Sequence, residues 1–329
     1  MAILVTGASG FIGRHLIRAL LESGPGPVIA TAKTLPQPKL PVKFLPVDLR
    51  DPSSVKSLIR EIRPSQIYHL AGYSSSANSF CEPGISLLEN VSIAINLLGA
   101  VSALKSPCRT LLLSTVQVYG DTPGGLSENC EPSPANPYAA SKLMMEEAAN
   151  FYYRNRRLDL VLARPGNQIG PGQSPDYVAS GFARALAEIE AGKRPARIEA
   201  GNLDAARDFL DVRDAAKGCL LLMAQGKSGE TYHLSSGNKV QVRELLDRLI
   251  ELSTVKRSCL KIIISGSRFR PEPKKGRDIC IRKIRALGFL PEIPLGNSLR
   301  DTLNYWRDRI SSASGPGSIE LNPAGPEDH

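Results

Sequence analysis

A glycine-rich segment near the N-terminus limits this chain to a small set of folds. It reads TGASGFIG from Thr6, with glycines at positions 7, 10 and 13. The apolar run AILVT precedes it, and a stretch with helical periodicity over 15–23 follows it. Glycines between a strand and a helix allow a tight turn and let backbone N–H groups approach a pyrophosphate. The segment therefore predicts dinucleotide binding, with a plain strand-to-helix turn as the alternative.

Short apolar strands alternate with amphipathic helices through the N-terminal half. The expected strands cover residues 2–6, 28–31, 43–45, 66–70, 110–114 and 160–163. The expected helices between them include 55–62, 87–104 and 139–153. This alternation predicts an α/β fold, with a Rossmann-type, doubly wound parallel sheet covered by helices on both faces.

The pattern changes after Arg164, where a segment rich in Gly and Pro leads to helices expected at 177–191, 241–253 and 298–310. A chain of 329 residues has room for two domains at roughly 150 residues each. We expect a nucleotide-binding domain over 1–164 and about 209–235. A smaller α/β substrate-binding domain would take about 165–208 and 236–310. The tail 311–329 has no apolar periodicity and is expected to be disordered.

Composition argues against several classes of protein. The hydrophobic and charged fractions, 42% and 22%, are ordinary for a soluble globular chain. No apolar run is long enough to span a membrane, and the N-terminus does not resemble a secretory signal, so we expect a cytoplasmic protein. The six cysteines and four histidines have no metal-ligand spacing, so the sequence predicts no metal site.

The net charge of +9 is concentrated near the C-terminus. The segment 255–309 holds 14 Lys and Arg residues against five Asp and Glu residues. A local basic excess indicates an anionic ligand, most commonly a phosphate. Nucleic acid is the competing ligand, but the aromatic content is only 5% and no basic amphipathic helix is evident.

A tyrosine and a lysine four residues apart, Tyr138 and Lys142, share one face of an expected helix. An ammonium near a phenol lowers the tyrosine pKa, and such a tyrosine exchanges a proton with a carbonyl or an alcohol. An apolar strand some 20 residues earlier ends in the hydroxyls of Ser114 and Thr115, at the sheet edge where ligands bind. The alternative for the tyrosine and lysine is a surface pair.

Together these features resemble the extended short-chain dehydrogenase/reductase family over about residues 1–310. The resemblance implies a catalytic group of Thr115, rather than Ser114, with Tyr138 and Lys142. Asp48 in VDLRD resembles the acid that contacts the adenine, and the segment 69–72 (HLAG) resembles the strand end that lines the cofactor. The cofactor-binding residues implied are Gly7, Gly10, Phe11, Ile12, Gly13, Asp48, Leu49, Leu70, Ala71, Tyr138 and Lys142.

Two segments of the C-terminal half resemble one branch of that family. The segments 164–178 (RPGNQIGPGQSPDYV) and 201–214 (GNLDAARDFLDVRD) are similar to GDP-mannose 4,6-dehydratases and GDP-4-keto-6-deoxymannose reductases. The resemblance implies substrate contacts by Asn167, Arg207, Arg270 and Glu272. Asp211 and Asp214 are as readily explained as helix N-terminal caps.

Within the branch, two departures favour the reductase. The dehydratases carry Thr-x-Glu at the catalytic hydroxyl, whereas this chain has Thr115-Val-Gln117, and glutamine cannot take up a proton. The dehydratases also have a long arginine-bearing loop after the second strand, whereas the corresponding connection in this chain is short. The resemblance thus implies reduction of the C4 ketone of GDP-4-keto-6-deoxy-D-mannose to GDP-D-rhamnose or its C4 epimer. The alternatives are a dehydratase, an epimerase, or a non-catalytic dinucleotide-sensing module.

The expected reductant is NADPH, with NADH as the alternative. The second strand ends in VIATAK at Lys33 and has no carboxylate to repel a 2′-phosphate, while Lys33 and Arg14 would attract one. The resemblance also implies a homodimer. Its interface would be formed by the helices Leu87–Leu104 and Ala139–Tyr153.

Overall fold

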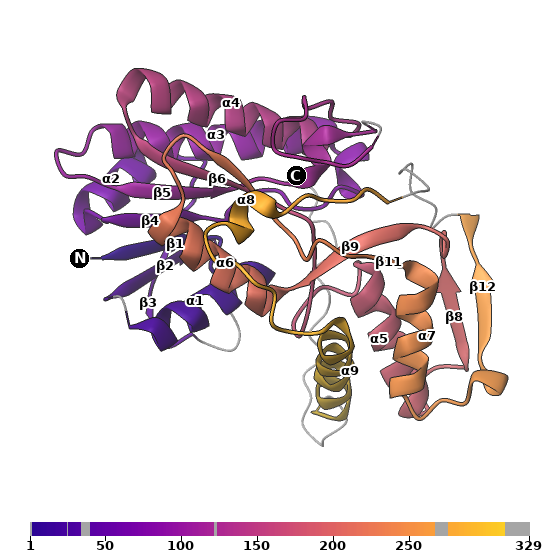
Figure 1. The fold of residues 1–329 in the computed structure, drawn as a ribbon. Coiled ribbons are helices and arrows are strands. Elements are labelled where there is room, and N and C mark those ends of the chain that lie inside the picture. Colours follow the sequence, from indigo (N-terminus) through magenta and orange to yellow (C-terminus); the bar gives the residue numbers. More distant parts are fainter. Residues whose placement is uncertain (1, 25, 34–39, 122–123, 267–275, 313–329) are drawn as a thin grey trace.

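The computed structural model describes the whole chain except residues 1, 25, 34–39, 122–123, 267–275 and 313–329. Its larger part is a layered α/β unit built mostly from the N-terminal half, and a smaller part holds α5, α7, α9 and several short strands (Figure 1). The polypeptide passes between the two parts more than once, so neither is one continuous segment.

A seven-stranded, wholly parallel sheet forms the centre of the larger part. The strand order is β10-β6-β5-β4-β1-β2-β3, so the direction of winding reverses between β1 and β4. In doubly wound sheets, ligands bind at the carboxyl ends of the strands at this reversal. The strands are β1 Ile3–Thr6, β2 Val28–Ala32, β3 Lys43–Pro46, β4 Gln66–His69, β5 Arg109–Leu113, β6 Asp159–Pro165 and β10 Thr231–Leu234.

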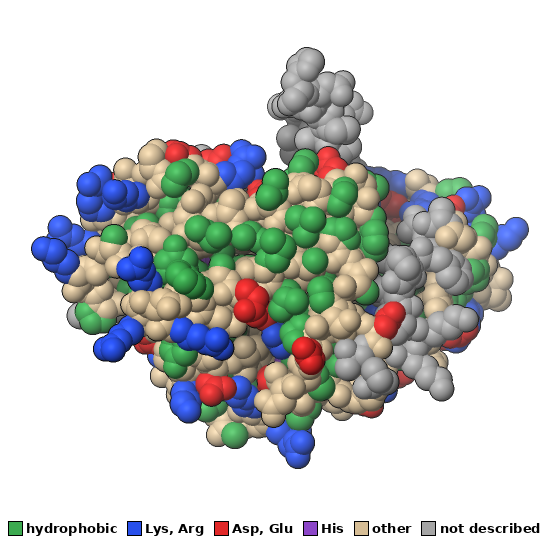
Figure 2. All heavy atoms as spheres, turned by 90° about the horizontal axis from the view of Figure 1, so that it is seen from above, with side chains coloured by type: hydrophobic (Ala, Val, Ile, Leu, Met, Phe, Trp, Pro, Cys, Tyr) green, Lys and Arg blue, Asp and Glu red, His purple; other side chains and the backbone are tan. Residues whose placement is uncertain are grey.

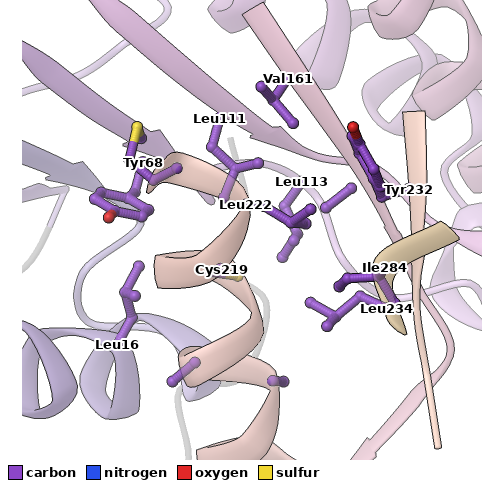
Figure 3. Close-up of a cluster of buried hydrophobic side chains, with 14 of the residues drawn as sticks. Leu16, Tyr68, Leu111, Leu113, Val161, Cys219, Leu222, Tyr232, Leu234 and Ile284 are labelled. Atoms are coloured by element: carbon purple, nitrogen blue, oxygen red, sulfur yellow. The ribbon is translucent and has the colours of Figure 1, made fainter. Parts of the chain in front are cut away.

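Helices cover both faces of this sheet, which confirms the predicted fold class (Figure 1). One face carries α1 (Phe11–Ser23) and α6 (Val212–Gln225), and the other carries α2 (Pro52–Ile62), α3 (Pro83–Ser102) and α4 (Pro137–Arg156). Figure 3 shows the first interface, where Leu16 of α1 and Leu222 of α6 pack against Tyr68 and Leu111 of the sheet. Burial of this kind of apolar surface supplies most of the stabilisation of such a layer.

The smaller part has a core of its own. Phe182, Leu186, Leu245 and Leu303 are buried together between helices and short strands. The helices are α5 Val178–Glu190, α7 Val242–Leu252 and α9 Leu295–Ser312. The strands form a three-stranded sheet and a two-stranded sheet: β7 Asn167–Ile169, β9 Ala206–Asp211 and β11 Lys239–Gln241, and β8 Arg197–Ala200 with β12 Lys261–Ile264. A one-turn helix, α8 (Arg282–Arg285), packs under β10.

One helix is apolar along much of its length. The sequence was expected to hold no apolar run long enough to span a membrane, whereas by length and composition α3 could cross one, with a mean hydropathy of 1.5 over its best window. Core helices of globular proteins pass the same test. One side of α3 is buried against the sheet and α4 through Ile93, Leu97 and Leu98.

Candidate active site

The glycine loop is shaped by contacts that leave no room for side chains. Gly7 has a φ of +67°, and a Cβ there would lie 2.6 Å from the amide nitrogen of Ala71. A Cβ on Gly13 would lie 2.4 Å from the carbonyl oxygen of Gly7. Gly10 is the N-cap of α1 and offers no side chain to the first N–H groups of that helix. The loop and helix N-terminus therefore have the geometry of an anion-binding turn.

Two neighbouring strand ends are tied together beside this loop. Thr6 Oγ1 lies 2.8 Å from His69 Nδ1 and accepts a hydrogen bond from the amide of Ala71 at 3.3 Å. Burial lowers the pKa of His69 to about 3, helped by the nearby charge of Lys142, so the imidazole is neutral. The link fixes the Leu70–Ala71 backbone against Gly7 at the point where the winding of the sheet reverses.

The first two residues of α1 and the residue after Asp48 have mainly packing roles in this structure. Phe11 makes an edge-to-face contact with His15, with ring centroids 5.7 Å apart, and Ile12 packs against the core. Leu49 is buried in the core under α2 and α3, so only its backbone could face a ligand, and its carbonyl accepts a hydrogen bond from Asn96.

Tyr138, in the first turn of α4, lies within hydrogen-bond reach of Thr115, which follows β5. Burial raises the pKa of Tyr138, the phenol of Tyr177 raises it further, and the Thr115 hydroxyl opposes both. The sequence predicted a lowered pKa, and that prediction is wrong for this structure because desolvation of the phenolate dominates. The phenol is therefore protonated at neutral pH, the form needed by a proton donor.

Lys142 is buried one turn beyond Tyr138, and its ammonium donates to the carbonyl oxygen of Leu113 at 3.0 Å. Burial lowers the pKa of Lys142 to about 8, and the carboxylate of Glu146 works against that shift. A Cβ on Gly72 would lie 3.4 Å from the Nζ atom, so the chain after β4 passes directly over the ammonium. Lys142 thus lies between the Tyr138 turn and the glycine-loop side of the sheet.

A buried chain of polar groups supports the strand end that carries Ser114 and Thr115. The Ser114 hydroxyl donates to Glu146, which also forms an ion pair with Arg164 at 2.5 Å. Arg164 in turn donates to Tyr119 at 2.5 Å, and the Tyr119 hydroxyl lies 2.7 Å from His233. The Ser114 hydroxyl is hydrogen-bonded to Glu146, and the hydroxyl of its neighbour Thr115 interacts with Tyr138.

Gln117 lies in the short 3₁₀ helix Val116–Tyr119, directly after Thr115. Its side-chain oxygen accepts a hydrogen bond from Asn136 at 3.3 Å, and Asn136 also caps α4 by accepting from the amide of Ala139. The Gln117 side chain is thereby held at the N-terminus of the helix that carries Tyr138. Its amide cannot act as a base.

The adenosine end of the expected cofactor site carries two ion pairs. Lys33 donates to Glu89 at 3.0 Å, and Asp48 pairs with Arg50 at 2.6 Å. The hydrogen bonds from Arg50 lower the pKa of Asp48 to about 2 despite some desolvation. All four side chains reach solvent, and exposed ion pairs contribute little free energy. A phosphate could therefore replace Glu89 or Asp48 as the partner of the cation at a small cost in free energy.

The residues implied as substrate contacts are only partly brought together. Asn167 begins β7 and donates to the carbonyl of Asp208, and Arg207, on the neighbouring β9, donates to the carbonyl of Ala206. Arg270 and Glu272 lie outside the described residues. Asp211 is the N-cap of α6, as its alternative explanation predicted.

Sequence reasoning missed two residues close to the site. Asn90 is buried on α3, donates to Ser141, and has a side-chain oxygen without a partner among the described residues. Its signal was a polar residue on the buried side of an otherwise apolar helix. Tyr177 precedes α5 and reaches the carbonyl of Ser74 with its hydroxyl at 3.4 Å. No local pattern identified it, because the contact joins residues 103 positions apart.

Known proteins are similar in sequence to most of this chain. The chain is 34% identical over 312 residues to the GDP-6-deoxy-D-mannose reductase of Pseudomonas aeruginosa, covering 94% of this chain and 98% of that protein. It is 33% identical to a GDP-6-deoxy-D-talose 4-dehydrogenase of Aggregatibacter actinomycetemcomitans, covering 77% of this chain and 80% of the relative.

Solved structures are also similar to this chain over nearly their whole length. The structure of RMD from Pseudomonas aeruginosa complexed with NADPH superposes with a TM-score of 0.81 at 33% identity, covering 94% of this chain and 99% of that one. A UDP-glucose 4-epimerase of Thermus thermophilus in complex with NAD reaches a TM-score of 0.83 at 28% identity, covering 93% and 99%. The sequence profile of the NAD dependent epimerase/dehydratase family matches residues 3–235. With its glycine loop and its Thr115, Tyr138 and Lys142 group in place, the chain belongs to the NAD dependent epimerase/dehydratase family, the extended short-chain dehydrogenase/reductases.

Proposed function

We propose that this chain is an oxidoreductase that uses NADPH to reduce the C4 ketone of GDP-4-keto-6-deoxy-D-mannose. The observation that carries the proposal is a protonated Tyr138 beside Thr115, with an amide and not a carboxylate at Gln117. A ketone reductase needs a proton donor and no base at that position. The similarity to GDP-6-deoxy-D-mannose reductase along almost the whole chain supports the same substrate.

The residues at the sheet edge fit a dinucleotide. The close approach of Gly7 to Ala71, the uncapped N-terminus of α1 and the buried Lys142 provide a turn, N–H donors and a cation for it. When bound, the reduced nicotinamide supplies the hydride that adds to the sugar C4. Lys33, and Arg14, which donates to the carbonyl oxygen of Ser9 at 2.9 Å, are the proposed contacts of the 2′-phosphate, and Asp48 would accept from the adenine.

Side chains of the protein would orient and protonate the oxygen at C4. Thr115 would orient the carbonyl, and Tyr138 would protonate the alkoxide as it forms. Lys142 would hold the nicotinamide ribose and place a positive charge near Tyr138, which stabilises the phenolate left after proton transfer. Asn167, Arg207, Arg270 and Glu272 are proposed to bind the nucleotide sugar. Residues 1–164 with about 209–235 are proposed to hold the cofactor, and about 165–208 with 236–310 the sugar nucleotide. Within the second set, Ile281 and Ile284 pack in the core of the larger part.

The experiment that tests this proposal is an incubation with enzymatically prepared GDP-4-keto-6-deoxymannose and each reduced cofactor in turn. We expect stoichiometric oxidation of NADPH and slower oxidation of NADH, with a GDP-6-deoxyhexose as the product. NMR of the product sugar would then assign the configuration at C4. GDP-D-rhamnose is the expected product, and GDP-6-deoxy-D-talose is the second candidate because a 4-dehydrogenase of that sugar is 33% identical to this chain.

Activity should fall as the pH rises through about 8. Lys142 has a pKa lowered by burial to about 8, so above that pH its ammonium loses the proton and the positive charge is gone. Tyr138, with its raised pKa, stays protonated over the same range. A profile of kcat/KM from pH 6 to 10 should fall about tenfold per unit on its basic side. A profile that stays flat to pH 10 would contradict this assignment of the charge to Lys142.

We also propose a cytoplasmic homodimer. Figure 2 shows apolar side chains gathered along the face formed by α3 and α4. Large exposed apolar residues on these two helices include Ile85, Leu88, Ile95, Met144 and Phe151. Exposed apolar side chains gathered on one face in this way mark a contact surface. The six free cysteines suit a reducing compartment.

Light scattering should give twice 35.5 kDa at micromolar protein concentration. Leu88→Lys combined with Phe151→Lys should give a monomer, since both side chains are exposed on the two helices of this proposed interface. Leu290→Lys is the matched control, because Leu290 is 69% exposed, close to the 70% of Leu88, and lies on neither helix. A wild-type monomer, or a dimer that survives the double substitution, would refute the interface.

A further inference from the structure

Tyr177 forms a hydrogen bond to the segment that follows β4, and the mechanism above does not use it. It is the N-cap residue of α5, in the smaller part of the molecule. The pKa of Tyr138 responds to the phenol of Tyr177, so the two hydroxyls are within electrostatic reach of each other. A second tyrosine, from the smaller part, therefore lies in the neighbourhood of the proton donor.

The backbone of Tyr177 is firmly anchored on its own side. Its amide donates to the carbonyl of Ser174 at 3.2 Å, and its carbonyl accepts from Gly181 at 2.8 Å. Ser180, in the same turn of α5, is buried and accepts a hydrogen bond from the indole of Trp306 on α9 at 2.9 Å. The ring of Tyr177 consequently projects from a fixed point and not from a free loop.

The side chain of Tyr177 reaches across to the larger part. Its hydroxyl donates to the carbonyl of Ser74 at 3.4 Å. Ser74 lies two residues after Gly72, whose backbone passes over the ammonium of Lys142. The segment after Ser74 is folded into a turn in which the amide of Ser79 donates to the carbonyl of Ser75 at 3.1 Å. The Tyr177 hydrogen bond thus links the two parts next to the catalytic group.

We propose that Tyr177 is a positioning residue that forms one wall of the hexose pocket and, through its bond to Ser74, holds the 73–80 segment against α5. This inference rests on the proposed function, because it assigns the hexose to the space near Tyr138. An aromatic ring with a polar tip suits the task, since its face packs on sugar C–H groups while its hydroxyl is bonded. Opening of the Tyr177–Ser74 contact would let the segment and the sugar move relative to Tyr138.

The expected effect of losing the hydroxyl is moderate. One hydrogen bond contributes about 1 kcal/mol net, which corresponds to about a fivefold change in affinity. Tyr177→Phe removes only that bond, whereas Tyr177→Ala also removes the ring. Tyr305→Phe is a matched control, because the Tyr305 hydroxyl also takes part in a 3.4 Å hydrogen bond, from Arg309 on its own helix.

Steady-state kinetics with GDP-4-keto-6-deoxymannose separates a positioning role from a general loss of structure. Tyr177→Phe should raise the KM for this ketone about fivefold. We expect the KM for NADPH and the Kd for GDP alone to stay as in the wild type, with kcat within about twofold. Tyr177→Ala should raise the KM further, and Tyr305→Phe should behave as the wild type. A KM unchanged in Tyr177→Phe, or an equal loss of GDP affinity, would overturn the proposal.

Hydrogen–deuterium exchange of the protein without ligands provides a readout that does not depend on activity. In Tyr177→Phe the amides of 73–80 should exchange faster than in the wild type, and in Tyr305→Phe they should not. Unchanged exchange would refute the contact with Ser74, and faster exchange with an unchanged KM would refute the role toward the sugar. A wild-type protein inactive on the ketone would remove the proposed function and the sugar role together, while exchange would still decide the contact.

Discussion

Tyr138→Phe should lower kcat by at least about 100-fold, the typical contribution of a positioned general acid. The substitution removes the hydroxyl that faces Thr115 and leaves the ring buried in the first turn of α4. Binding should be nearly unaffected, because the glycine loop and the proposed nucleotide-sugar contacts are untouched. Stopped-flow or steady-state oxidation of NADPH with the ketone, together with calorimetric titration of NADPH and GDP, measures both quantities.

Tyr305→Phe again serves as the control, since it makes the same chemical change on α9, an element that carries none of Thr115, Tyr138 and Lys142. It should retain wild-type turnover. Turnover close to the wild type in Tyr138→Phe would rule out the tyrosine as the proton donor. A parallel loss of kcat and of NADPH affinity would indicate a folding defect and would also count against the assigned role.

Glu146→Leu should destabilise the fold by about 3–5 kcal/mol, the range found when one partner of a buried ion pair is removed. The side chains of Glu146 and Arg164 are only 2% and 7% exposed. Without the carboxylate, the guanidinium would lose two hydrogen bonds and keep only its contact with Tyr119, and Ser114 would lose its acceptor. Urea unfolding followed by circular dichroism gives the free energy.

The double substitution Glu146→Leu with Arg164→Met separates a broken pair from a simple packing defect. Replacing both charges by apolar groups removes the uncompensated guanidinium, so the double variant should be more stable than Glu146→Leu alone. The opposite order of stability would contradict the account of an isolated buried charge. Because Ser114 precedes Thr115, both variants should also lose part of their turnover.

The larger part of the fold was predictable because its signals are local. The apolar strands from Ile3 to Pro165 were found within a residue or two of their observed ends. Two helices start four residues earlier than predicted: α1 begins at Phe11 and not at His15, and α3 begins at Pro83 and not at Leu87. Gly10 explains the offset of α1, since a helix can start directly after a glycine cap. The strands of the smaller part, such as β7 and β11 with three residues each, are too short for a periodicity to be visible.

The site residues that belong to sequence motifs could be predicted. Gly7, Tyr138 and Lys142 meet at one edge because parallel strands bring their carboxyl ends together. The electrostatics were not predictable, since the sequence shows that Lys142 follows Tyr138 by one turn but not that both are buried. Burial decides that the tyrosine pKa rises and the lysine pKa falls. Tyr177 and Asn90 act through contacts distant in sequence, which only the fold supplies.

The central claim rests on Gln117, where the related dehydratases are expected to carry the base that removes the C5 proton. Gln117→Glu would put a carboxylate beside Thr115, and trace elimination would follow only if the C5 proton lay within about 3 Å of it. Failure of that variant would therefore be uninformative about the wild type.

Two incubations of the unmodified protein, one with GDP-mannose and one with GDP-4-keto-6-deoxymannose, test the claim most directly. Each would be followed by NADPH absorbance and by chromatography of the sugar nucleotides. The account predicts that GDP-mannose is returned unchanged and that the ketone is reduced with one NADPH oxidised per product. Robust conversion of GDP-mannose to its 4-keto-6-deoxy derivative without added reductant would contradict the reductase assignment.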